Sequence, residues 1–292
     1  MIDIPPTLRQ RLARTRLVAG DAIARGGVGE RRSASKGEGI EFEDHRQYQF
    51  GDDFRRLDPH LSARLGSPHV RQFNVTQQLN VTIVIDASRS MAAGRPSKLE
   101  YAVAVARCLA HVGLSGSDAV QAAVLNEDGV RWHRPVSGVG RLGELEQWLT
   151  NWSPSGGSDL QGAVHAIRER LKLRSLTFLL SDFWSDSALA SMDALAAAGQ
   201  SVVAVQVLAP DELDPTPLVG GQLRLMDMET SDEVEVAIGQ NEVARYRELL
   251  AAWTEQLRQR VLGARGRFIT VSSDTPLDEM FMRVLPAAGV LV

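Results

Sequence analysis

At 292 residues, the chain is long enough to bury a core that folds without disulfide or metal cross-links. An apolar content of 44% and a charged content of 23% argue against a wholly disordered chain and against an integral membrane protein. The net charge of -4 argues against a general binder of polyanions. The single cysteine, Cys108, cannot pair within the chain, which suits a reducing compartment.

The N-terminal residues lack the uninterrupted apolar run of a secretory signal. No later stretch has about 18 apolar residues in a row, the length that spans a bilayer. We therefore expect a cytoplasmic protein without a transmembrane segment. Peripheral association with a membrane stays open.

Residues 1–76 are predicted to form an N-terminal segment that packs on the main domain. Arginines between Arg9 and Arg16 indicate a short basic helix, which we interpret as a solvated face rather than a nucleic-acid contact. In the polar-aromatic stretch 42–73, arginines and aspartates interleave. Ion pairs that latch this stretch to the main domain are the favoured interpretation, and a partner-binding surface is the alternative.

Residues 77–292 alternate short β-branched runs with longer amphipathic stretches, which is typical of βαβ units. The candidate strands are 79–85, 119–125, 130–135, 176–180, 202–208 and 268–271, and helical spacing recurs in 99–110 and 160–167. Several of the strands are nearly continuous apolar runs, as expected of strands buried on both faces. The predicted fold class is α/β: a doubly wound, mainly parallel sheet flanked by helices, Rossmann-like in its general plan.

The stretch 211–239 interrupts this alternation. It contains two plausible strands, 222–228 and 233–238, joined by a short turn, and we predict a β-hairpin insertion. A long helix over 241–262 resumes the alternation, and Pro276 is expected to open the last helix.

Five oxygen-bearing side chains are predicted to meet at one edge of the sheet. The run VTIVIDASRSM ends a buried strand in Asp86, followed by Ser88 and Ser90. Ser158 follows in SPSGGSDL, and Asp182 ends the apolar run LTFLLSDF. Ligands bind at the carboxyl edge of open α/β sheets, and such oxygen ligands suit a hard cation. Asp-x-Ser-x-Ser alone also suits a turn or a helix cap, so the prediction depends on the three loops together.

These motifs resemble a known site. DASRS followed by SGGSDL and SDF is similar to the metal-ion-dependent adhesion site (MIDAS) of von Willebrand factor A domains, which holds Mg²⁺ or Mn²⁺. The resemblance implies that Asp86, Ser88, Ser90, Ser158 and Asp182 surround such a metal. Ser158 stands where that family usually has threonine, and the missing methyl group removes a contact that helps to fix the side chain.

The resemblance extends upstream of the first strand. The block RQYQFGDDFRRLDPHLSARLGSPHVRQF is similar to the region that defines the bacterial domain-of-unknown-function 58 proteins, a von Willebrand factor A-like group. Pro59 departs from the pattern, which usually has tryptophan there. Members are typically encoded beside MoxR-type AAA+ ATPases, so the resemblance implies such an ATPase, with its client protein, as partner.

Two classes of function compete. The favoured hypothesis is a non-enzymatic adaptor, whose metal captures a carboxylate of a partner protein. The alternative is a Mg²⁺-dependent hydrolase or phosphoryl-transfer enzyme that uses Asp86 and Asp182. The sequence shows no phosphate-binding glycine loop, no nucleophile elbow and no zinc-ligand cluster, so no catalytic residues are assigned. A nucleic-acid binder that works through the N-terminal arginines is a third, weaker option.

Overall fold

The structure of the chain is a computed structural model. It describes residues 2–18, 40–52, 54–75, 78–156, 164, 170, 175–185, 187–197, 199–219, 222–226, 233–237 and 239–292. The chain divides into two compact units, one made of Met1–Val28 with Leu79–Val292 and the other of Gly29–Gln78. The predicted segment 1–76 is therefore not one piece, because its first part belongs to the larger unit. Packing of 42–73 on the main domain stays a prediction.

The larger unit is built on a sheet of seven described strands, in which β11, β8, β7, β3 and β4 run parallel and β5 is antiparallel at one edge. The short β6 pairs antiparallel with β4. These strands are β3 (Asn80–Asp86), β4 (Ala119–Asn126), β5 (Gly129–Trp132), β6 (Val136–Ser137), β7 (Leu176–Ser181), β8 (Ser201–Leu208) and β11 (Arg267–Ser272). All six predicted strands are present, and the fold class is confirmed.

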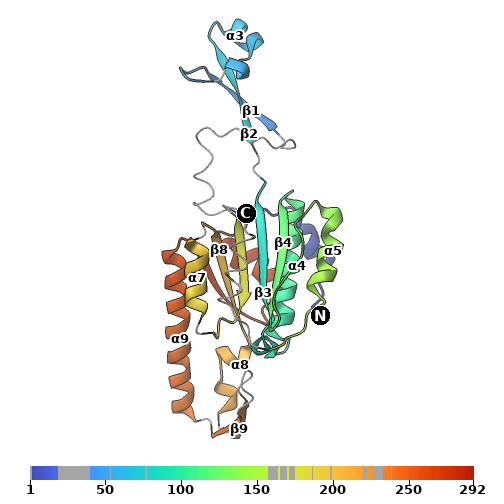
Figure 1. Cartoon of the computed structure of the whole chain (residues 1–292). Coiled ribbons are helices and arrows are strands. Elements are labelled where there is room, and N and C mark those ends of the chain that lie inside the picture. Colours follow the sequence, from blue (N-terminus) through green and yellow to red (C-terminus); the bar gives the residue numbers. More distant parts are fainter. Residues whose placement is uncertain are drawn as a thin grey trace. The chain divides into compact units, whose positions relative to one another are not determined.

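Helices cover both faces of this sheet (Figure 1). The described helices of this unit are α1 (Pro6–Leu12), α4 (Lys98–Ser115), α5 (Leu142–Leu149), α7 (Ala188–Ala197), α8 (Pro210–Leu213), α9 (Gln240–Gly263), α10 (Leu277–Glu279) and α11 (Leu285–Ala287), with single-turn helices η2 (Arg89–Ala92), η3 (Val139–Arg141) and η4 (Thr216–Leu218) and a π-helical turn η5 (Met280–Val284). Alternate residues of β3 face opposite ways. Ile83 joins the core under α4, whereas Val84 joins the core under α7 and α9.

The N-terminal helix α1 is part of the main core. Leu8 and Leu12, one helical turn apart, are buried in the same cluster as α4, and residues 16–18 pair through their backbones with residues 290–292. The basic helix is therefore amphipathic and anchored by its leucines, and only its arginine-bearing side fits the predicted solvated face.

The smaller unit is a β-hairpin with helical turns between its strands. β1 (Ile40–Gln47) pairs antiparallel with β2 (His69–Val75), and η1 (Phe54–Arg56) and α3 (Pro59–Leu65) lie between them in sequence. Asp58 caps α3 by accepting a hydrogen bond from the Leu61 amide, and Pro59 occupies the first helical turn, where proline is favourable. Arg46, one of the arginines of the polar-aromatic stretch, pairs with Asp52 at 2.6 Å within this unit.

The insertion contains the predicted hairpin, with β9 (Gln222–Met226) antiparallel to β10 (Glu233–Ala237). The long helix α9 follows it, and Pro276 immediately precedes α10, both as expected. The predicted helix 160–167 lies almost entirely outside the described residues. None of the helices described here is both long and apolar enough to cross a membrane.

Candidate functional site

The candidate site lies where the chain order in the sheet reverses. From β3 the chain proceeds to β4 and β5 on one side, and then to β7, β8 and β11 on the other side. The crevice outside the carboxyl ends of two such diverging strands is the usual ligand site of open α/β sheets. Here those ends are Asp86 on β3 and Ser181, followed by Asp182, on β7.

Asp86 is held by both strands. Its side chain is buried, with Oδ1 accepting the Ser88 amide at 2.9 Å and Oδ2 accepting the Ser181 hydroxyl at 2.7 Å. Burial raises the pKa of Asp86, and the nearby Asp182 carboxylate raises it further, while its hydrogen bonds lower it. A cation placed between the two carboxylates would therefore be favoured electrostatically.

Two hydroxyls lie side by side in the loop after β3. Ser88 Oγ and Ser90 Oγ are 3.1 Å apart, close enough to contact one ion together. The next loop runs alongside, because the Ser155 amide donates to the Ala87 carbonyl and the Arg89 amide donates to that of Gly156. The third predicted hydroxyl, on Ser158, lies outside the described residues.

Asp182 has a partner that the sequence analysis missed. The Nζ atom of Lys98 lies 2.7 Å from Asp182 Oδ2, and the side chains of both residues are almost completely buried. Asp182 Oδ1 accepts the Trp184 amide at 3.2 Å. The signal available in sequence was the capping box of Ser97 and Glu100, which fixes Lys98 at the first position of α4. It gives no hint that the ammonium group faces inward.

Lys98 also joins the site to the segment after β8. Its Nζ lies 2.7 Å from Glu212 Oε1 on α8, and the same oxygen accepts the indole N–H of Trp184 at 3.3 Å. Glu212 Oε2 accepts the Ala209 amide at 2.7 Å. Among the described side chains, the carboxylates of Asp86, Asp182 and Glu212 therefore meet the lysine Lys98 where β3, β7 and β8 end.

The loop between β7 and α7 is strained at its centre. Phe183 has a φ of +59°, a region that bulky residues rarely occupy and that is often found near functional sites. Its side chain is buried and its carbonyl accepts the indole N–H of Trp253 on α9 at 3.1 Å. This arrangement turns Trp184 outward, with 40% of its surface exposed.

The donor set limits what kind of metal fits. Within the described residues, no group of three or more histidine, cysteine, aspartate or glutamate side chains is placed to hold a metal ion. Among the described residues at this edge, the candidate ligands therefore include the serine hydroxyls, which are hard oxygen ligands of the kind that Mg²⁺ accepts.

Comparison with known proteins gives relatives without an assigned function. Uncharacterized proteins from Mycobacterium bovis and Mycobacterium tuberculosis are each 30% identical to the chain over 209 residues. The match covers 69% of this chain and spans 65% of the length of each relative.

Solved structures with a similar arrangement include the conserved hypothetical protein BatB of Bacteroides thetaiotaomicron, 15% identical, with a TM-score of 0.46 over 72% of this chain and 98% of BatB. The manganese-loaded TRAP protein of Plasmodium vivax is 14% identical, with a TM-score of 0.37 over 74% of each chain. Residues 44–257 match the family described as "Protein of unknown function DUF58". Because this match spans most of the chain, the chain belongs to that family.

Proposed function

We propose that the chain is a non-enzymatic adaptor that binds a carboxylate of a partner protein through a divalent cation, Mg²⁺ or Mn²⁺. The observation that carries this proposal is the junction of β3 and β7. There the hydrogen bond from Ser181 fixes Asp86, and the hydroxyls of Ser88 and Ser90 lie together at the same edge.

In this proposal the hydroxyls of Ser88, Ser90 and Ser158 bind the cation directly. Asp86 and Asp182 act around it through water, because each described carboxylate oxygen already accepts a protein donor. A cation held mainly by neutral ligands keeps enough positive charge to attract an external carboxylate. When bound, the cation would supply one electrophilic position for that carboxylate.

A MoxR-type AAA+ ATPase and its client are the proposed partners, on the family resemblance alone. The competing enzyme hypothesis requires Asp86 or Asp182 to act as a base or nucleophile. The contacts of both carboxylates disfavour that role, because each of their oxygens already accepts a protein donor and so is not placed to take a proton from a substrate.

The test combines calorimetry with partner capture. Wild type should bind Mg²⁺ or Mn²⁺ at one site, and Asp86→Ala should weaken that binding about 100-fold, because it removes the carboxylate that orients the loop. The variant should keep a near-normal melting temperature. Pull-down of the ATPase by the full chain should be lost in EDTA and in Asp86→Ala.

Two outcomes would contradict the proposal. If titration calorimetry of wild type shows no heat of binding at millimolar metal, the proposed metal site does not exist. Metal-dependent hydrolysis of a phosphoester, ester or peptide by the purified chain, lost in Asp86→Ala, would establish the enzyme instead.

A further inference from the structure

An apolar pocket opens beside the candidate metal loops. It has a volume of about 420 Å³ and lies between the β7–α7 loop and the middle of α9. Trp184, Tyr246, Leu249 and Trp253 form most of its wall. The exposed fraction is 60% for Leu249 and 40% for Trp184, so large apolar groups border the opening. Clustered exposed apolar side chains of this kind mark binding surfaces.

The polar atoms of the two tryptophans are already used. The indole N–H of Trp184 donates to Glu212, and that of Trp253 donates to the carbonyl of Phe183. Both rings therefore present carbon surface to the pocket, and among its lining residues the polar groups come from Tyr246 and Gln256. The chemistry of the wall selects an apolar side chain.

The pocket and the metal loops share a residue and an edge. Trp184 forms a wall of the pocket, while its amide holds Asp182. Tyr246 lies near Glu212, whose charge adds to the effect of burial in raising the pKa of that tyrosine to about 12. A chain segment that reaches the metal with one side chain can therefore reach the pocket with a neighbouring one.

We propose that the occupant of this pocket is a large apolar side chain, aromatic or leucine, of a partner segment whose acidic residue binds the metal. This inference rests on the proposed function and extends it, because it defines the recognised motif as acidic and apolar together. Metal coordination would supply the requirement for a carboxylate. The pocket would supply selectivity among acidic segments.

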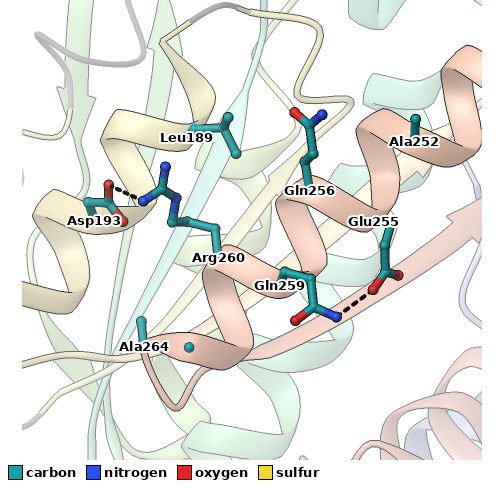
Figure 2. A pocket seen from close by; sticks show the side chains of 9 residues that line it. Leu189, Asp193, Ala252, Glu255, Gln256, Gln259, Arg260 and Ala264 are labelled. Carbon is teal, nitrogen blue, oxygen red and sulfur yellow. Dashed lines mark hydrogen bonds and ion pairs between the residues drawn. The ribbon is translucent and has the colours of Figure 1, made fainter.

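The surface beyond the pocket offers a path for the rest of the segment. A groove of about 860 Å³ between α7 and α9 shares Ala252 and Gln256 with the pocket, so the two hollows adjoin. Figure 2 shows its polar walls, in which Arg260 pairs with Asp193 at 3.3 Å and Gln259 donates to Glu255. These groups satisfy one another, so we assign no specific contact to the groove.

The experiment uses a display library of short peptides with one fixed glutamate and random flanking positions, selected on the full chain in Mn²⁺. Selected peptides should carry a large apolar residue near the glutamate. Leu249→Lys should weaken their binding about tenfold or more without changing Mn²⁺ affinity, because it places a charge at the pocket mouth. Leu262→Lys is the matched control, because Leu262 is an exposed leucine of the same helix outside the pocket.

The outcomes separate this inference from the proposed function. Peptides that need Mn²⁺ and glutamate, show no apolar preference and bind Leu249→Lys unchanged would overturn the pocket assignment alone. If no peptide binds in a manner that depends on Mn²⁺ and glutamate, the proposed function fails and this inference fails with it.

Discussion

A buried aspartate lies at each end of the sheet, and the surroundings of the two aspartates differ. At the carboxyl end of β3, Asp86 is close to a second carboxylate, Asp182, with Lys98 nearby. At the amino end of β4, Asp118 is also buried, although less completely. It accepts the amide of Leu79 at 3.0 Å, and the charge of Arg16 acts to lower its pKa.

The contrast separates a structural carboxylate from one suited to binding. Asp118 accepts a hydrogen bond from a backbone amide just before β3 begins, so its role is structural. At the other end, three carboxylates and one lysine lie together among the described side chains, and serine hydroxyls lie beside them. A cluster of carboxylates with hydroxyl oxygens beside it is suited to binding an external cation.

Replacing Lys98 tests the charge balance at the carboxyl end most severely. Lys98→Met should lower the free energy of unfolding of the metal-free protein by about 3–5 kcal/mol, because Asp182 stays buried without its countercharge. Mg²⁺ should raise the melting temperature of the variant more than that of wild type, since the ion supplies the missing charge. Denaturant unfolding with and without Mg²⁺ measures both effects.

A matched control is Arg134→Met, which breaks an exposed ion pair with Glu144 and should cost less than about 1 kcal/mol. Equal stability losses in the two variants would show that the lysine is not a buried countercharge.

Removing a single hydroxyl distinguishes a ligand from a buried serine. Ser88→Ala should weaken Mn²⁺ binding about 100-fold, equivalent to about 2.7 kcal/mol, if this hydroxyl binds the ion. Ser191→Ala removes another buried hydroxyl, which lies on α7 and donates to the Ser187 carbonyl, and this variant should leave Mn²⁺ affinity unchanged. Titration calorimetry of both variants decides, and equal affinities would remove Ser88 from the proposed ligands.

The sequence predicted much of the carboxyl end of the sheet because its signals are local. The strand before Asp86 is a nearly continuous apolar run, and the serines follow it at fixed spacing. The hairpin and the long helix α9 were likewise visible from turn residues and periodicity.

The parts that were missed depend on contacts between distant residues. Lys98 is 84 residues from Asp182 and 114 from Glu212, and an isolated lysine in sequence is expected to be exposed. The sequence analysis interpreted α1 by its charged residues and missed its two buried leucines, Leu8 and Leu12. Their spacing of four residues indicates one apolar face.

Titration of Asp118 tests the structural end of the comparison and should give the smallest effect. Burial raises the pKa of this carboxyl from 3.8 to about 6, so the folded state holds its proton at pH values where the unfolded chain has lost it. The unfolded state then binds fewer protons, and stability must fall as the pH rises from about 4 to about 6 and stay level above that range. Asp118→Asn can still accept the Leu79 amide but cannot titrate. The full shift corresponds to about 3 kcal/mol, and because solvent screens part of it, the variant should remove a fall on the order of 1–2 kcal/mol from this window. Urea unfolding at several pH values measures the difference. An unchanged slope in the variant would place the titrating group elsewhere, and any change in Mn²⁺ affinity would show that the two ends of the sheet are coupled.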